Sequence, residues 1–230
     1  MTGLHHEIRQ AGGRVARVRF TTSADGDFAA DGARPELDAR RRRVADVPWT
    51  WLRQVHGADV VVVDAPGARA GERADAAVTV VPGAALAVQT ADCAPVALVG
   101  ASGGVGAVHA GWRGLEAGVI ERAAAVLDDL GAGPLRAIVG PCIHPECYEF
   151  GERELERLAA RYGSAVRGRT AGGRPALDLP ATVGAALAGA GIEQVAGPGP
   201  CTACGELELH SHRARRDTAR QAMVVWSEAA

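Results

Sequence analysis

The feature of this sequence that most constrains its fold is a pair of short apolar runs separated by a tight turn, within residues 88–114. The runs are Pro95–Val99 and Val105–Val108, and the Ser-Gly-Gly at 102–104 between them is typical of a turn. We expect the two runs to pair as neighbouring strands. Cys93 precedes the first run and His109 follows the second, so this pairing would bring a thiol and an imidazole to the same end of the two strands.

The rest of the chain mixes strand and helix patterns. Residues 14–20 alternate apolar and charged side chains, which predicts a half-buried strand, and the four valines at 60–63 predict a strand buried on both faces. Apolar residues at helical spacing predict three helices, over 114–130, 152–162 and 179–190. No regular alternation of strand and helix holds. We therefore expect an α/β (α+β) fold, a single domain over residues 1–230 built as a layered sandwich of mixed β-sheets flanked by helices.

Charge and hydropathy exclude several classes of protein. A formal net charge of −2 argues against a nucleic-acid-binding protein, and the basic run Arg40–Arg43 is typical of a solvated helix face. No segment approaches the ~18 apolar residues of a membrane span, and the first ten residues lack the apolar region of a signal peptide. We expect a cytoplasmic protein with no membrane or nucleic-acid partner, a monomer or weak oligomer, whose five cysteines are free thiols or metal ligands.

His56, Cys93 and His109 each lie beside the end of a predicted strand, which makes them candidates for a catalytic site. Two imidazoles and one thiolate suit Zn²⁺, and three protein ligands leave the fourth tetrahedral position open to water or substrate. The same residues permit a metal-free cysteine hydrolase, with Cys93 as nucleophile, His109 as base and Asp92 or His56 as the orienting group. Spacing alone leaves both interpretations open, together with the plainer one of a buried thiol and two satisfied histidines.

Four further thiols form a second candidate site. Cys142-x4-Cys147 and Cys201-x2-Cys204 have spacings that a structural zinc site could use. The alternative is that these proline- and glycine-rich segments simply turn the chain.

Several short motifs, in order along residues 50–226, resemble the laccase-domain family. They are Q-V-H-G at 54–57, R-A-D-A at 73–76, Q-T-A-D-C-A-P-V at 89–96, A-V-H-A-G-W-R-G at 107–114, G-P-C-I at 140–143, Y-E-F-G at 148–151, S-H-R at 211–213 and R-Q at 220–221. Members of that family were first called multicopper polyphenol oxidases and are now described as purine nucleoside phosphorylases with side activities.

The resemblance implies a zinc site formed by His56, Cys93 and His109. It also implies phosphorolysis of adenosine, inosine, guanosine and methylthioadenosine, with adenosine deamination as a second activity, and a fold related to the deamidating-toxin cysteine hydrolases. The expected partners are therefore purine nucleosides and phosphate. Cu²⁺ could occupy the same ligands because it binds nitrogen and sulfur donors more tightly than zinc. With seven histidines and one H-x-H in the chain, we expect any oxidase activity to be adventitious.

Phosphorolysis requires a pocket for phosphate, and guanidinium groups are the natural donors. By motif position the candidates are Arg53, Arg113 and Arg213, with Arg220 behind them; the alternative for each is an ordinary ion pair. Trp112 would either stack on a purine or pack into the core.

Four carboxylates could serve as the proton carrier that deamination needs, and the sequence does not choose among them. They are Asp75, Asp92, Glu116 and Glu149. The segment at 21–27 lacks the arginine and the G-G-x-S loop usual in the family, so a domain that binds metal without turnover is a further alternative.

Overall fold

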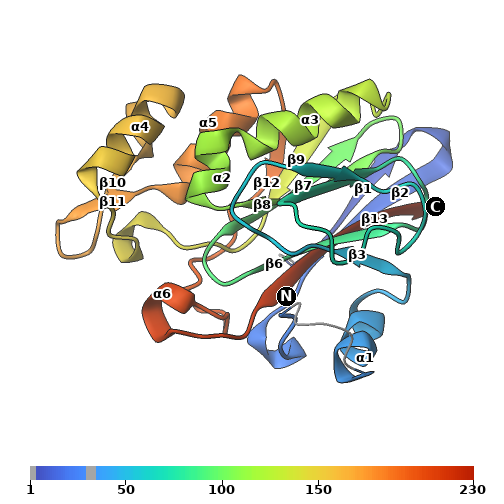
Figure 1. Ribbon diagram of the computed structural model, residues 1–230, viewed down its shortest axis with the longest axis horizontal. Coiled ribbons are helices and arrows are strands. Elements are labelled where there is room, and N and C mark those ends of the chain that lie inside the picture. Colours follow the sequence, from blue (N-terminus) through green and yellow to red (C-terminus); the bar gives the residue numbers. More distant parts are fainter. Residues whose placement is uncertain (1–3, 30–34) are drawn as a thin grey trace.

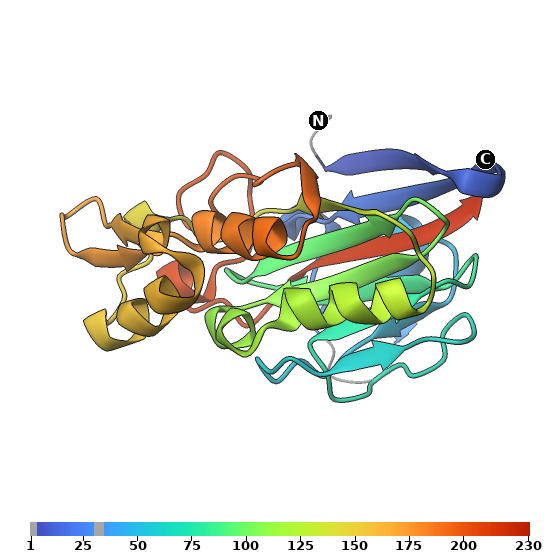
Figure 2. The ribbon, with the colours of Figure 1, turned by 90° about the horizontal axis from the view of Figure 1, so that it is seen from above.

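The computed structural model describes residues 4–29 and 35–230. Two mixed β-sheets pack face to face, with helices on both outer sides (Figures 1 and 2). The six-stranded sheet has the order β12 (Glu193–Ala196), β9 (Leu135–Val139), β7 (Ala94–Gly100), β8 (Val105–Ala110), β5 (Ala76–Thr79), β4 (Val60–Val62). The five-stranded sheet has the order β1 (His5–Gln10), β2 (Arg14–Phe20), β13 (Gln221–Ala229), β6 (Ala85–Thr90), β3 (Trp49–Trp51). A separate hairpin joins β10 (Arg167–Arg169) to β11 (Pro175–Leu177).

Within the described residues there are six α-helices, and they cover the outer faces of the two sheets or lie at their ends. They are α1 (Pro35–Val44), α2 (Trp112–Ala117), α3 (Val119–Asp129), α4 (Glu152–Tyr162), α5 (Leu179–Gly189) and α6 (His212–Arg215). Short 3-10 turns are η1 (Ala11–Gly13), η2 (Ser23–Asp25), η3 (Pro145–Cys147) and η4 (Ser164–Val166). The mixed α/β class predicted from the sequence is confirmed. None of the helices in residues 4–29 and 35–230 combines the length and the apolar character that crossing a bilayer requires.

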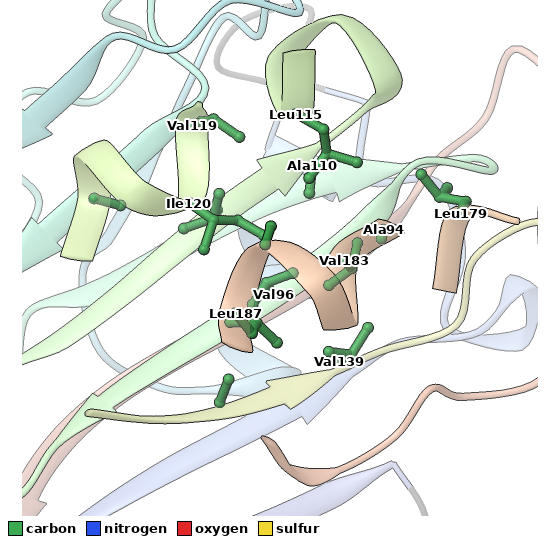
Figure 3. Close-up of a cluster of buried hydrophobic side chains, with 14 of the residues drawn as sticks. Ala94, Val96, Ala110, Leu115, Val119, Ile120, Val139, Leu179, Val183 and Leu187 are labelled. Atoms are coloured by element: carbon green, nitrogen blue, oxygen red, sulfur yellow. The ribbon is translucent and has the colours of Figure 1, made fainter. Parts of the chain in front are cut away.

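The central strands are apolar on both faces because they lie between two layers of core. Along β7, Val96 and Leu98 belong to the apolar cluster that includes residues of α3 and α5, and Figure 3 shows Val96 beside Leu187 and Ile120, whereas Ala97 and Val99 belong to the cluster shared with the five-stranded sheet. This alternation follows from the two-residue period of a strand. The outer face of the five-stranded sheet is covered by α1 in a third apolar cluster that includes Leu37.

The predicted pairing of the two apolar runs is confirmed. β7 and β8 form an antiparallel hairpin in which Ala94 lies opposite Ala110 and Pro95 opposite His109. Its turn includes Gly103, with φ of +113°, a value that favours glycine. Cys93 and His109 therefore lie at the same end of neighbouring strands.

Two predicted elements are wrong in detail. The valine run is not buried on both faces: β4 is an edge strand that pairs only with β5, and the side chain of Val62 is 41% exposed. The predicted helix over 114–130 is two helices, because Gly118 adopts a left-handed conformation (φ +82°) that ends α2 and begins α3. The first residues of α2 lie beside the end of β8, because α2 begins at Trp112, directly after Gly111 (Figure 1).

The basic run at 40–43 is a solvated helix face only in part. Arg42 and Arg43 are exposed, but Arg41 is buried and its guanidinium carbon lies 5.2 Å from the ring centre of Trp51. By contrast, the predicted strand at 14–20 and helix at 152–162 coincide with β2 and α4. The segment at 21–27 contains η2, closed by mutual capping between Thr22 and Asp25.

Candidate metal centre and substrate cleft

The loop that carries His56 is held by a single buried carboxylate. Asp75 accepts hydrogen bonds from the backbone N–H groups of Val55 (3.1 Å), His56 (2.9 Å) and Gly57 (2.7 Å). These bonds stabilise the left-handed conformation of His56 (φ +59°), which is unfavourable for a residue with a side chain. The carboxylate thus determines where this imidazole points.

Asp75 also orients the second imidazole. Its Oδ1 lies 2.8 Å from Nδ1 of His109, and both side chains are buried. Burial raises the pKa of Asp75, but hydrogen bonds from His109 and the backbone outweigh it, so the pKa of this carboxyl is lowered. A carboxylate bound to the far nitrogen of a histidine is the usual support for a metal ligand. The expectation that Asp92 or His56 orients His109 is wrong; Asp75 does so.

The structure brings His56, Cys93 and His109 together. One ligand atom from each lies within 4.8 Å of the others, and Sγ of Cys93 is 3.8 Å from Nε2 of His56. Tetrahedral zinc, with bonds of about 2.0–2.3 Å, holds neighbouring donor atoms roughly 3.3–3.6 Å apart, so the three residues need only close slightly on an ion. One sulfur and two nitrogen donors suit zinc or copper.

Glycine at position 111 leaves room for these ligands. A Cβ atom there would lie 2.9 Å from Cδ2 of His56 and 3.1 Å from Sγ of Cys93. Both distances are shorter than ordinary carbon contacts, so any side chain at this position would displace a ligand.

Without a metal, the Cys93 thiol and the His109 imidazole each shift the pKa of the other towards the charged form. Burial raises the pKa of Cys93, but the charge and hydrogen bonding of His109, with a contribution from His56, lower it to about 6. Burial lowers the pKa of His109, but Cys93 and Asp75 together raise it to about 9. A thiolate at neutral pH is both a metal ligand and a nucleophile, so this pair fits both chemical interpretations.

A cleft of about 720 Å³ opens beside the three ligands, and residues of both α2 and α6 line it. Its walls contain all the residues expected for substrate binding, Arg53, Arg113, Arg213 and Arg220, together with Trp112, Tyr148 and His212. The segment at 21–29 reaches the cleft, because Ala29 is one of its lining residues. Asp27 ties this segment to the cleft wall by accepting hydrogen bonds from the backbone N–H groups of Ala29 (2.8 Å) and Arg220 (3.0 Å).

Three of the cleft arginines have no carboxylate partner among residues 4–29 and 35–230. Arg113 lies against Trp112, with its guanidinium carbon 4.5 Å from the ring centre, and Arg213 lies 5.0 Å from the ring centre of Tyr148. Arg53 is exposed at the cleft. The ordinary ion pair considered as the alternative is therefore not seen for these three residues within the described chain. Their positive charge is available to an anion.

Arg220 differs from the other three. Its Nη1 donates hydrogen bonds of 2.9 Å to the carbonyl oxygens of Asp217, Thr218 and Ala219, so part of its guanidinium braces its own loop. Trp112 packs edge-on against Phe150 at 5.4 Å and also lines the cleft.

The four candidate carboxylates have distinct environments, and none is a free acid in the described cleft wall. Asp92 lines the cleft, but it accepts hydrogen bonds from Thr202 (2.7 Å), Ser211 (2.6 Å) and the backbone of Arg213 (2.6 Å). Those bonds hold the turn from β6 to β7, where Asp92 has φ of +112°. Glu116 and Glu149 form ion pairs with Arg157 and Arg174, respectively.

Tyr148 is a cleft residue that the sequence analysis quoted in a motif without assigning it a role. Burial, reinforced by the nearby Cys93 thiolate, raises the pKa of its hydroxyl, so the group stays protonated and can donate a hydrogen bond. The Y-E-F-G motif was the available signal, since tyrosine combines a large apolar ring with a polar hydroxyl and is enriched at binding interfaces.

The predicted four-thiol site is wrong in one ligand. Cys147, Cys201 and Cys204 do converge, but the fourth residue of the cluster is Glu146. Cys142 is fully buried in the apolar core, where burial raises the pKa of its thiol.

The sequence comparisons show the family to which the chain belongs. The family described as multi-copper polyphenol oxidoreductase laccase matches residues 21–228, and the chain belongs to that family. Curated relatives over nearly the whole length are named purine nucleoside phosphorylase. One from Streptomyces coelicolor is 39% identical over 98% of this chain and 96% of its own length, and one from Mycobacterium tuberculosis is 36% identical over 95% and 90%.

Solved structures share the same fold. A Neisseria meningitidis protein superposes with a TM-score of 0.80 at 25% identity, covering 99% of this chain and all of the other. The protein YlmD from Geobacillus stearothermophilus superposes with a TM-score of 0.77 at 28% identity, covering 94% of this chain and 93% of its own.

Proposed function

We propose that this protein, as a single domain over residues 1–230, is a zinc-dependent purine nucleoside phosphorylase. Its substrates would be phosphate and adenosine, inosine, guanosine or methylthioadenosine. The observation that carries the proposal is the set of three arginines without carboxylate partners, Arg53, Arg113 and Arg213, in one cleft with the cluster of His56, Cys93 and His109. The names of the curated relatives support the same activity.

In this reaction a phosphate oxygen bonds to C1′ of the ribose while the bond between C1′ and the purine nitrogen breaks. The base leaves with the electron pair of that bond and takes up a proton, which gives a free purine and ribose 1-phosphate, or 5-methylthioribose 1-phosphate when the substrate is methylthioadenosine. The three guanidinium groups would bind the phosphate and orient one of its oxygens towards C1′, because planar guanidinium groups match phosphate in both charge and geometry.

The aromatic residues of the cleft would position the nucleoside. The ring of Trp112 faces the cleft beside Arg113, where it would stack on the purine. The Tyr148 hydroxyl, kept protonated by its raised pKa, would donate a hydrogen bond to the substrate.

His56, Cys93 and His109 would hold the metal, with Asp75 fixing both imidazoles. When bound, zinc supplies a Lewis acid that polarises an oxygen or nitrogen of the substrate. Copper could occupy the same three ligands.

One observation favours a second candidate function. Cys93, His109 and Asp75 are arranged as a nucleophile, its base and an orienting carboxylate, and the lowered pKa of Cys93 suits a nucleophile. This is the arrangement that the expected relation to the deamidating-toxin cysteine hydrolases would preserve.

The test measures base release by the full-length protein, with zinc loaded and with zinc removed. We expect free hypoxanthine from inosine and adenine from adenosine, only with phosphate and only with zinc. Phosphate-dependent base release that persists without metal would remove zinc from the proposal. Turnover that needs neither metal nor phosphate would replace the proposal with the cysteine hydrolase. Inosine formed from adenosine without phosphate would indicate a deaminase, and bound zinc without any turnover would indicate a metal-binding domain only.

A further inference from the structure

A second cluster of metal-ligating side chains lies outside the cleft. Glu146, Cys147, Cys201 and Cys204 each place one ligand atom within 4.8 Å of the others. We propose that this set, here named the loop cluster, binds a second zinc-like divalent cation through three thiolates and one carboxylate. The cation would be structural, and the proposal does not depend on the activity of the cleft.

The backbone around the loop cluster holds its ligands in place. Two segments run side by side: Cys142 and Cys201 form a parallel bridge, and the backbone N–H of Thr202 donates to the carbonyl of Cys142 at 3.0 Å. The chain then turns tightly, with the N–H of Gly205 bonded to the carbonyl of Cys201 at 2.9 Å. A Cβ at position 205 would lie 2.4 Å from that carbonyl oxygen, so only glycine permits this turn between Cys201 and Cys204.

One sulfur of the loop cluster is fixed by a backbone hydrogen bond. The backbone N–H of His144 donates to Sγ of Cys201 at 3.4 Å, and Cys201 is buried. This contact holds the sulfur beside the other ligand atoms of the cluster. Peptide N–H groups that point at a cysteine sulfur are compatible with its use as a metal ligand.

A hydrogen bond already joins two of the four ligands. The thiol of Cys204 donates to Oε1 of Glu146 at 3.5 Å. Two basic side chains lie beside the cluster: Nδ1 of His144 is 3.8 Å from Glu146, and the guanidinium of Arg215 bonds backbone carbonyls of the 201–204 loop and pairs with Asp217 at 3.2 Å. A divalent cation between the four ligands would take the place of the thiol protons, because metal binding to cysteine releases them.

The ligand set selects the kind of ion. Three thiolates exclude calcium and magnesium, which require oxygen ligands, and favour zinc. Four protein ligands fill a tetrahedral coordination sphere and leave no position for substrate, which is the pattern of structural zinc sites. Among the described residues, the His56, Cys93 and His109 cluster has three ligands and so leaves one position open.

The position of the loop cluster gives the bound ion a role. Tyr148, which follows Cys147 directly, lines the cleft, and Thr202, which follows Cys201 directly, donates a hydrogen bond to Asp92 beside Cys93. An ion that fixes Cys147 and Cys201 would therefore brace the wall of the cleft that carries Tyr148 and the turn that carries Cys93.

The test is the zinc content of full-length protein, loaded under reducing conditions and desalted, measured by elemental analysis. We expect about two zinc ions per wild-type chain. We expect about one in Cys204→Ser, which removes an exposed ligand and should fold, and about one in His56→Ala, which removes a cleft ligand. The double variant should hold none, and Cys142→Ala, a thiol outside both clusters, should hold two.

A second measurement identifies the ligands without depending on any single variant. Cobalt bound to His56→Ala should give a sulfur-to-cobalt charge-transfer band about three times as intense as cobalt bound to Cys204→Ser, because three cysteines ligate in one cluster and one in the other. Glu146→Gln should keep that band and weaken metal affinity. One zinc per wild-type chain, kept by Cys204→Ser and lost by His56→Ala, would overturn the proposal. A disulfide between two of the loop thiols that persists under reducing conditions would overturn it as well.

Discussion

The cleft cluster of His56, Cys93 and His109 and the loop cluster of Glu146, Cys147, Cys201 and Cys204 use similar donors but are built differently. Strand ends and one buried carboxylate hold the cleft ligands, with His109 on β8 and Asp75 bonded to both histidine segments. The loop ligands lie in irregular segments held by backbone hydrogen bonds. The cleft cluster has three ligands on a rigid frame, so a metal bound there would keep one position open for catalysis. The loop cluster has four ligands, so a metal bound there would stabilise the loops that carry them.

The largest expected effect separates the two clusters directly. His56→Ala should abolish zinc binding in the cleft and with it phosphate-dependent base release, because two ligands do not hold zinc tightly in a site open to water. Elemental analysis and a turnover assay measure the two losses. Glu116→Gln, a surface carboxylate paired with Arg157, is the control and should leave both unchanged. Full zinc content in a His56→Ala, Cys204→Ser double variant would contradict the assignment of both clusters.

Thiol alkylation of the metal-free, reduced protein compares the two clusters by charge. The thiolate is the reactive form, so the alkylation rate of Cys93 should rise as pH increases through about 6. At pH 7 a thiol with that pKa is roughly ninety times more ionised than one with a pKa of 9. In the loop cluster the pKa values are raised, by burial for Cys147 and by its hydrogen bond with Cys147 for Cys204, so both should react only at higher pH.

Mass spectrometry of the alkylated peptides assigns each rate to its cysteine. Asp75→Asn should move the Cys93 profile towards higher pH, because the imidazolium of His109 loses its carboxylate partner. Equal profiles for Cys93 and Cys204 in the wild-type protein would show that the His109 charge does not act on this thiol.

Asp75→Asn should also weaken zinc in the cleft by about 10–100-fold, the usual effect of removing a carboxylate that supports a metal-bound histidine. The side-chain amide would also place an N–H donor against the backbone N–H groups of Val55 and Gly57, which donate hydrogen bonds to the carboxylate in the wild-type protein. Competition with a chromogenic chelator measures the affinity. The loop cluster is the internal control, since its zinc affinity should not change; parallel weakening of both sites would indicate general unfolding instead.

The smallest expected effect is on phosphate binding by the cleft arginines. Arg113→Lys keeps the charge but loses the planar fork of donors, and we expect the KM for phosphate to rise about tenfold, equivalent to about 1.4 kcal/mol, with a smaller change in KM for the nucleoside. Steady-state kinetics with each substrate varied in turn separates the two. Arg157→Lys, an arginine paired with Glu116 outside the cleft, is the matched control. A rise confined to the nucleoside KM would assign Arg113 to base binding.

The cleft cluster was largely predictable because local patterns determine it. Apolar runs and a turn fix the β7–β8 hairpin, and the hairpin register brings Cys93 and His109 to one end. The role of Asp75 was not predictable, since it depends on three backbone N–H groups and an imidazole that only tertiary structure brings to it.

The loop cluster was predicted with one wrong ligand for a similar reason. Cysteine spacing identified Cys147, Cys201 and Cys204, but Cys142 lies where the chain leaves β9 and its side chain enters the core. Glu146 takes the fourth position because η3 turns the chain between His144 and Cys147. The prediction that the valine run at 60–63 is buried on both faces was also wrong, because an apolar run does not reveal that β4 lies at the edge of its sheet.

The hydrogen bond from Thr202 to Asp92 connects the loop that carries Cys201 to the turn that carries Cys93. Through this contact, the proposed cation in the loop cluster and a ligand in the cleft would bind in linked equilibria. Such linkage is reciprocal in free energy. If a cation in the loop cluster raises nucleoside affinity by a given factor, a nucleoside in the cleft must raise cation affinity by the same factor, so the resting zinc content of this protein would depend on the supply of its substrate.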